Sequence, residues 1–170
     1  MVSNFDLIVE KSLAFVKSLD GVYNHSKGTW NNLDHIRLLA ECPELVQAFG
    51  EYGMTCTYAA AVVVNAPYRP PCHVDNPAFS LARINFPLLN CKNTITEFYT
   101  NAKTSPNSSR HLEVINMRDC VLVDKFELTT ATVIRVQEAH RIVVPFNNPS
   151  PRISLTLDFD KDPVYMLESI

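Results

Sequence analysis

Two histidines and one aspartate in this chain have the residue types and the spacing of a metal-binding triad. His73 and Asp75 are separated by one residue, and His140 lies far downstream. Side chains two positions apart on a strand share a face, so an imidazole and a carboxylate at one strand end can reach the same ion. Two imidazoles and one carboxylate form the facial triad that holds Fe(II) and leaves coordination positions open for a substrate and oxygen. The three residues therefore predict a metal-dependent oxygenase.

A basic residue and a hydroxyl follow the second histidine at the same spacing. Arg152 and Ser154 fall on the strand expected after the one that carries His140. By default an arginine on a strand is solvated, but the i, i+2 spacing places both side chains on one face. A guanidinium beside a hydroxyl is a good receptor for the outer carboxylate of a dicarboxylic cosubstrate that chelates the metal. The sequence thus predicts one combined site for a metal and a carboxylate.

These motifs together resemble the Fe(II)/2-oxoglutarate-dependent oxygenase superfamily, whose pattern is HxD, a distal histidine, and a basic residue that often lies in an RxS triplet. The resemblance covers residues 58–159 and every ligand position of the pattern. Residues 73–77 are also similar to the metal motif of oxygen-sensing prolyl hydroxylases, but so short a stretch does not identify a substrate. The resemblance implies a double-stranded β-helix, the cupin-like jelly-roll fold.

The resemblance also implies roles for individual residues. The ligands of Fe(II) would be His73, Asp75 and His140, and the outer carboxylate of 2-oxoglutarate would bind Arg152 and Ser154. Further candidates for cosubstrate contacts are Asn85, Arg83 and Tyr99. A buried amide at Asn85 needs partners that a carboxylate could provide, whereas Arg83 could equally form a salt bridge at a sheet edge.

The implied reaction consumes O2 and 2-oxoglutarate, releases succinate and CO2, and hydroxylates an amino acid, a peptidyl side chain or another small metabolite. The iron and the cosubstrate carry this chemistry, and the protein orients the substrate and excludes water. Halogenating relatives replace the carboxylate ligand by a small residue, so Asp75 argues against that branch. Tyr68 and Arg69, just ahead of the metal motif, and the loop 101–110 flank the expected mouth and could contact the substrate.

Two other classes of function remain open. His73 beside Pro70 and Pro71 could be a turn residue, and the chain would then be a catalytically silent jelly-roll module that binds a carboxylated ligand or a protein partner. The other alternative is a cupin-like metalloenzyme without 2-oxoglutarate. Surface positions are expected for the other histidines, which are His25, His35 and His111. The segment 21–28 with Tyr23 and Trp30 could form a lid, although loop aromatics more often pack between helix and sheet.

The fold expected from residue patterns is mainly β with N-terminal helices. Apolar residues recur at helical spacing in 5–19 and 33–40, and Pro43 can begin a third helix. Eight β-rich runs follow, at 57–65, 81–89, 94–100, 112–116, 121–128, 132–136, 142–146 and 153–159. We expect one domain over residues 1–170, with a helical buttress at 1–53 and a jelly-roll core at 54–160.

The composition of the chain indicates which partners and which cellular compartment to expect. The 170 residues carry a net charge of −3, which gives no bulk attraction for nucleic acid. The five cysteines are an odd number without a CxxC pair, so neither a disulfide framework nor a thiolate zinc site is expected. The sequence has neither an apolar stretch long enough to cross a membrane nor an export signal at its N-terminus. These features predict a cytoplasmic protein with reduced thiols and no membrane partner.

Overall fold

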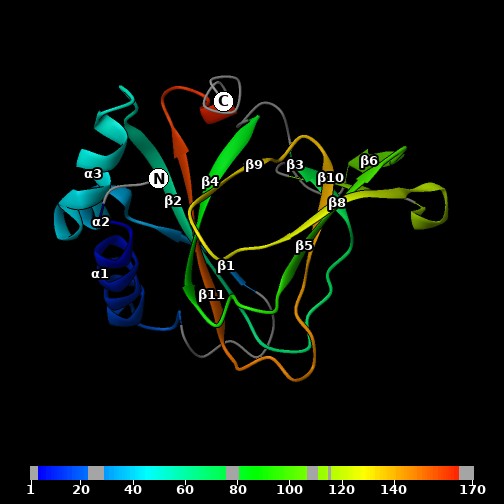
Figure 1. Ribbon diagram of the computed structural model, residues 1–170, viewed down its shortest axis with the longest axis horizontal. Coiled ribbons are helices and arrows are strands. Elements are labelled where there is room, and N and C mark those ends of the chain that lie inside the picture. The colour runs from blue at the N-terminus through cyan, green and yellow to red at the C-terminus, as the bar shows by residue number, and fades with distance from the viewer. Residues whose placement is uncertain (1–3, 23–28, 76–80, 107–110, 115, 165–170) are drawn as a thin grey trace.

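The computed structural model describes residues 4–22, 29–75, 81–106, 111–114 and 116–164 (Figure 1). Three α-helices are described, α1 (Phe5–Ser18), α2 (His35–Glu41) and α3 (Pro43–Gly50), together with the short 3-10 helix η1 (Met117–Asp119). Strands pair antiparallel throughout two sheets. The five-stranded sheet has the order β1 (Thr29–Leu33), β2 (Cys56–Val64), β11 (Arg152–Phe159), β4 (Ala82–Leu89), β9 (Thr132–Arg135). The six-stranded sheet has the order β6 (Thr104–Pro106), β7 (His111–Val114), β3 (His73–Asp75), β10 (Ala139–Val143), β5 (Ile95–Thr100), β8 (Val121–Glu127).

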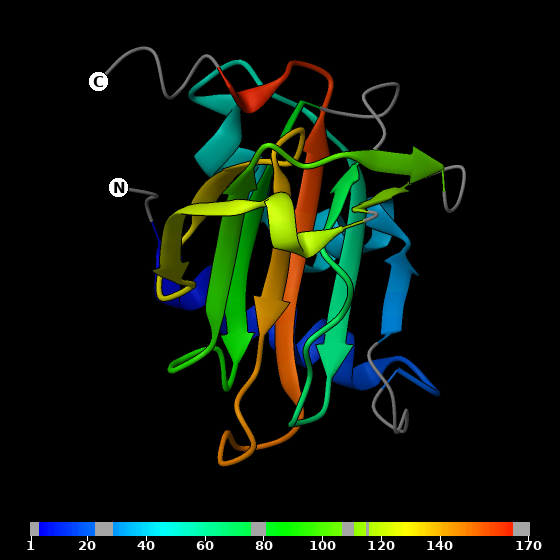
Figure 2. The same ribbon diagram turned by 90° about the vertical axis from the view of Figure 1, so that its right-hand side faces the viewer.

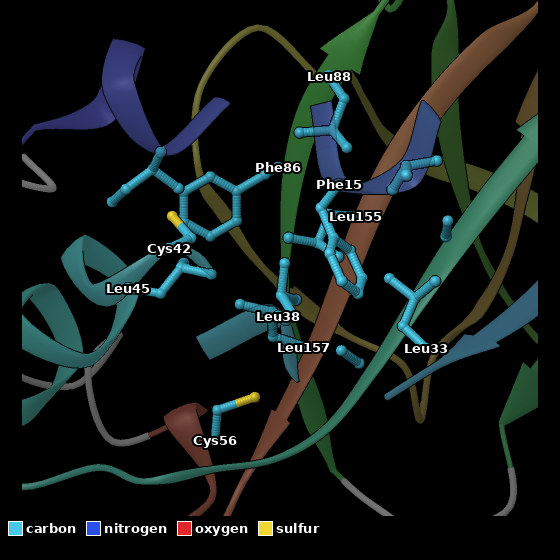
Figure 3. Packing of buried hydrophobic residues seen from close by; sticks show 14 of the residues in the cluster. Phe15, Leu33, Leu38, Cys42, Leu45, Cys56, Phe86, Leu88, Leu155 and Leu157 are labelled. Carbon is cyan, nitrogen blue, oxygen red and sulfur yellow. The ribbon is translucent and has the colours of Figure 1, made fainter. Parts of the chain in front are cut away.

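The three helices cover the outer face of the five-stranded sheet, at the left of Figure 1. Helix α1 buries Ile8 and Phe15 on its apolar side, and α3 begins with Pro43, which a first helical turn tolerates. Figure 3 shows Phe15 in the same buried cluster as Phe86 and Leu155 of the sheet. Burying one such side chain contributes about 1.5–3 kcal/mol, so this layer stabilises the sheet that carries Arg152 and Ser154.

Alternation along β11 separates this core from a second, polar face. Ile153 and Leu157 belong to the hydrophobic cluster under the helices, whereas Arg152, Ser154 and Thr156 point to the opposite side. Successive side chains of a strand project from opposite faces, so one strand builds both the core and a cavity between the two sheets. Figure 2, turned by 90°, shows β11 in the middle of its sheet, with β2 on one side and β4 on the other.

Most of the predicted elements are confirmed, but one prediction is wrong. Residues 1–53 are not entirely helical, because Thr29–Leu33 forms a strand at the sheet edge, with Trp30 opposite Val62. The free edge of β2 accepts this segment, and Leu33 is buried in the core beneath α2. Helix α2 therefore begins at His35, after the capping side chain of Asp34, which accepts a hydrogen bond from the Arg37 N–H at 3.1 Å.

Two short strands were not predicted from the sequence, and a third begins earlier than predicted. Strands β3 and β6 have three residues each, too few for an alternating pattern. Strand β10 begins at Ala139, ahead of the predicted run 142–146, and so includes His140. All five cysteines are free thiols. Among the described helices, none is long and apolar enough to cross a membrane.

Candidate metal site

The three predicted metal ligands come together on neighbouring strands of the six-stranded sheet. His73 on β3 lies directly opposite His140 on β10, and their ring centroids are 4.6 Å apart. Asp75 shares the face of His73, and one ligand atom from each of the three residues lies within 4.8 Å of the others. The backbone of Asp75 is anchored, since its N–H donates to the Val136 carbonyl at 2.9 Å. The i, i+2 spacing therefore places His73 and Asp75 on one face, as the sequence predicts.

Backbone carbonyls set the orientation of both imidazoles. The Nδ1 atom of His140 lies 2.8 Å from the Glu138 carbonyl oxygen, and Nδ1 of His73 lies 3.4 Å from that of Pro71. A protonated Nδ1 that faces a carbonyl leaves Nε2 unprotonated, which is the form that binds a metal. Burial, followed by the nearby His140, lowers the pKa of His73 to about 4. At neutral pH this imidazole is uncharged, as metal ligation requires.

The carboxylate of Asp75 is held by an arginine from the opposite sheet. Nη1 of Arg83 lies 2.7 Å from Asp75 Oδ2, and its Nε donates to Asp158 Oδ1 at 2.9 Å. The guanidinium carbon of Arg83 also stands 5.3 Å from the centroid of the Trp30 ring. Burial raises the pKa of Asp158, against the lowering effect of Arg83. Arg83 therefore forms the salt bridges that the sequence left as an alternative, and it does so at the wall of the cavity.

A cavity of about 220 Å³ joins the triad to the inner face of the five-stranded sheet. This volume is below the range of about 300–1,000 Å³ that is usual for drug-sized ligands, so the cavity suits a small molecule. The polar part of its lining, apart from the triad and Arg83, includes Asn85, Thr96, Arg152, Ser154 and Thr156. Apolar side chains, including Leu128 and Val136, complete the wall and limit access of water. The cavity thus combines metal ligands with hydrogen-bonding groups in a largely apolar enclosure.

Arg152 is a buried cation at the wall of this cavity. Its relative exposure is 1%, and burial lowers the pKa of its guanidinium. Nε donates to Thr94 Oγ1 at 3.2 Å and Nη1 donates to Ser154 Oγ at 2.9 Å. No carboxylate of the described residues forms a salt bridge with Arg152. A guanidinium has five N–H donors, so further donors remain for an anion that enters the cavity.

Ser154 and Asn85 add hydrogen-bonding capacity beside Arg152. The Ser154 hydroxyl accepts from Arg152, which leaves its own hydrogen available to donate. Oδ1 of Asn85 is buried and has no hydrogen-bond partner among the described parts of the chain. A buried polar atom without a partner is costly, and a ligand in the cavity would relieve that cost. Both residues lie where the sequence predicts pocket contacts.

Two of the predicted contacts lie outside the cavity. The Tyr99 hydroxyl donates to Glu97 and accepts from Arg141, on the outer face of β5. The prediction for Tyr99 is corrected because Thr96, on the inward face of the same strand, lines the cavity instead. Arg69 is exposed and lies 3.8 Å from Glu97, whereas Tyr68 lines the cavity, and burial raises the pKa of its phenol.

Several residues were missed or lie beyond what the structure describes. Trp30 was expected to pack between helix and sheet, yet it lines the cavity with 39% of its surface exposed. Asp158 could have been found by alternation, because it continues the face of Arg152 and Ser154 along one strand, whereas no signal in the sequence links Thr96 to the site. Tyr23, His25, most of the segment 21–28 and the end of the loop 101–110 lie outside the described residues, as does the side chain of His111. His35 begins α2, on the far side of the five-stranded sheet.

The donor set fits a divalent first-row metal. Metal–nitrogen and metal–oxygen bonds of about 2.0–2.2 Å place ligand atoms on one face of a metal about 3 Å apart, so the three side chains must turn inward from the observed separations to bind one ion. Two imidazoles and one carboxylate are a donor set that non-haem Fe(II) sites and catalytic zinc sites both use. The chain matches no family model, and a search of curated proteins also finds no match.

Proposed function

We propose that this protein is an Fe(II)- and 2-oxoglutarate-dependent dioxygenase that hydroxylates an amino acid, a peptidyl side chain or another small metabolite. The observation that carries the proposal is Arg152, a buried guanidinium without a described carboxylate partner, in the same cavity as His73, Asp75 and His140. A buried charge is costly unless an opposite charge compensates it, so this position favours an anionic ligand. A dicarboxylate that reaches from the metal to Arg152 would satisfy both ends of the cavity.

The strand pairing supports a jelly-roll core. Leaving aside β1, β6 and β7, eight strands remain among the described residues. The first pairs with the last (β2 with β11), the second with the seventh (β3 with β10), the third with the sixth (β4 with β9) and the fourth with the fifth (β5 with β8). Nested pairing of this kind is expected when one long antiparallel hairpin is rolled into two facing sheets. We therefore propose the double-stranded β-helix as the fold of residues 54–160.

The residues of the chain would divide the work as follows. Bound Fe(II), with 2-oxoglutarate and O2 as cosubstrates, supplies the oxidation, and succinate and CO2 are the coproducts. His73, Asp75 and His140 would hold the metal, and the cavity that they line would admit the cosubstrate and the substrate. Arg152 and Ser154 bind the outer carboxylate and so fix the direction of the cosubstrate.

The substrate would enter past aromatic residues. Trp30 is partly exposed and Tyr68 is half-buried, and both line the cavity. The free thiols support a reducing, cytoplasmic setting for this chemistry.

Anaerobic titration of the protein with Fe(II) tests the proposal. A weak visible metal-to-ligand absorption band should develop only when 2-oxoglutarate is also present, and His73→Ala should abolish it. His35→Ala, a histidine variant on the other side of the five-stranded sheet, should retain the band. Release of succinate over a panel of amino acids, peptides and nucleosides would then identify the substrate class.

The same measurements separate the alternatives. Absence of both the band and succinate release in wild-type protein would contradict the proposal and favour a silent binding module. Fe(II) binding that is indifferent to 2-oxoglutarate and to Arg152→Ala would instead favour a cupin-like metalloenzyme.

A further inference from the structure

Arg83 connects the two sheets beside the metal ligands. It lies on β4 of the five-stranded sheet, and its guanidinium reaches Asp75 on β3 of the six-stranded sheet at 2.7 Å. Its Nε also donates to Asp158 on β11 at 2.9 Å, and Trp30 from β1 packs against it. Arg83 is only 9% exposed, so four strands hold one buried guanidinium in a single orientation.

The two oxygens of Asp75 have different surroundings. Oδ2 is engaged by Nη1 of Arg83, whereas Oδ1 lies 3.6 Å from Nε2 of His73. A carboxylate with one oxygen held by a guanidinium offers mainly the other oxygen to a metal. Binding through a single oxygen would conserve the open coordination positions that an oxygenase needs.

We propose that Arg83 is a positioning residue that directs Oδ1 of Asp75 toward the metal, and that it does not contact the cosubstrate. This inference rests on the proposed metal site. Asp158 and Trp30 hold Arg83, and Arg83 in turn holds Asp75. The planar fork of a guanidinium can bridge two carboxylates in fixed directions, which a lysine ammonium cannot do.

Electrostatics and orientation make opposite predictions for the loss of Arg83. Removing a positive charge close to Asp75 and Asp158 would by itself favour a cation. Loss of orientation would instead weaken metal binding. Partners that hold a metal ligand in place typically account for about 10- to 100-fold in metal affinity, and we expect a loss of that order here. The sign of the change therefore identifies the role of Arg83.

Titration of the metal-free protein with Co(II), followed by calorimetry and by the visible d–d spectrum, tests the proposal. Arg83→Met should bind Co(II) roughly 10- to 100-fold more weakly than wild type. The matched control is Arg141→Met, which removes a guanidinium that is similarly enclosed (12% side-chain exposure against 10% for Arg83) and is paired with Glu97 at 2.8 Å on the outer face of the sheet. The control should retain wild-type affinity and an unchanged Co(II) spectrum.

Unchanged or tighter Co(II) binding by Arg83→Met, with a lowered melting temperature alone, would overturn the proposal and leave Arg83 as a structural ion pair. If this variant does not fold, Arg83→Lys decides, because it keeps the positive charge and loses the planar fork that holds both Asp75 and Asp158. Arg83→Lys should weaken Co(II) binding, and wild-type affinity there would also refute the positioning role. Failure of wild-type protein to bind Co(II) at all would instead contradict the proposed function itself.

Discussion

Replacement of Arg152 by methionine should weaken 2-oxoglutarate binding without lowering the stability of the ligand-free protein. The guanidinium is almost fully buried, and its hydrogen-bond acceptors among the described residues are two hydroxyls, those of Thr94 and Ser154. In the metal-free protein this leaves a buried charge without a described counter-ion. In the proposed complex the same charge would face the outer carboxylate of 2-oxoglutarate.

The changes in 2-oxoglutarate affinity and in the free energy of unfolding can be estimated from the hydrogen bonds of Arg152. Two hydrogen bonds from a charged donor are worth about 1.5–3 kcal/mol each, so Arg152→Met should weaken 2-oxoglutarate binding by about 3–6 kcal/mol, or roughly 10²- to 10⁴-fold. For the ligand-free protein, the lost bonds to Thr94 and Ser154 oppose a desolvation cost of several kcal/mol. We expect the free energy of unfolding to stay constant or to rise by up to about 2 kcal/mol, which corresponds to at most roughly 4–8 °C in Tm.

Two measurements on the same preparations check this prediction. Calorimetric titration of the Fe(II)-loaded protein with 2-oxoglutarate under anaerobic conditions gives the affinity, and thermal unfolding of the metal-free protein gives Tm. Arg152→Lys keeps the charge but loses the fork, so its affinity should lie between those of wild type and Arg152→Met. Arg118→Met, at an exposed arginine on η1, should change neither quantity. Wild-type affinity for 2-oxoglutarate in Arg152→Met would refute the assignment of the carboxylate site.

Three further predictions concern the same site and the layer that supports it. The pKa of His73 is about 4 in the folded protein, against an ordinary value of 6.5. As the pH falls, the unfolded chain therefore binds a proton at His73 at a higher pH than the folded protein does. The free energy of unfolding should therefore fall by about 2–3 kcal/mol between pH 6.5 and pH 4, and urea titrations should show a smaller fall in His73→Gln. Ser154→Ala removes one donor to the proposed carboxylate, so calorimetry should show 2-oxoglutarate binding weakened roughly 10- to 100-fold, and unchanged affinity would exclude that contact. Phe15→Ala in the helical layer should cost about 3–5 kcal/mol in chemical denaturation, whereas Ile36→Ala, at a side chain that is 71% exposed, should cost less than about 0.5 kcal/mol.

The sequence by itself was enough to predict the metal triad and the pair Arg152 and Ser154. The spacing of His73 and Asp75 defines their common face once they lie on a strand, and the same rule pairs Arg152 with Ser154. The helical periodicity of residues 5–19 likewise predicted α1, because an amphipathic helix needs only local sequence to define its apolar side. These predictions depend on backbone geometry over a few residues, which the sequence contains directly.

Only the tertiary structure decided what lies next to those residues. The strand at Thr29–Leu33 forms because β2 has a free edge to pair with. It runs almost directly into α2, so the hydrophobic pattern of the sequence does not separate the strand from the helix. The outward face of Tyr99 depends on which face of β5 meets the other sheet, a choice that alternation leaves open. Arg83 and Asp158 are 75 residues apart in the chain, and the ion pair of Arg83 with Asp75 joins the two sheets. Local sequence determines the periodicity of a side-chain pattern, whereas the partner of a charged group depends on distances that exist only after the sheets have packed.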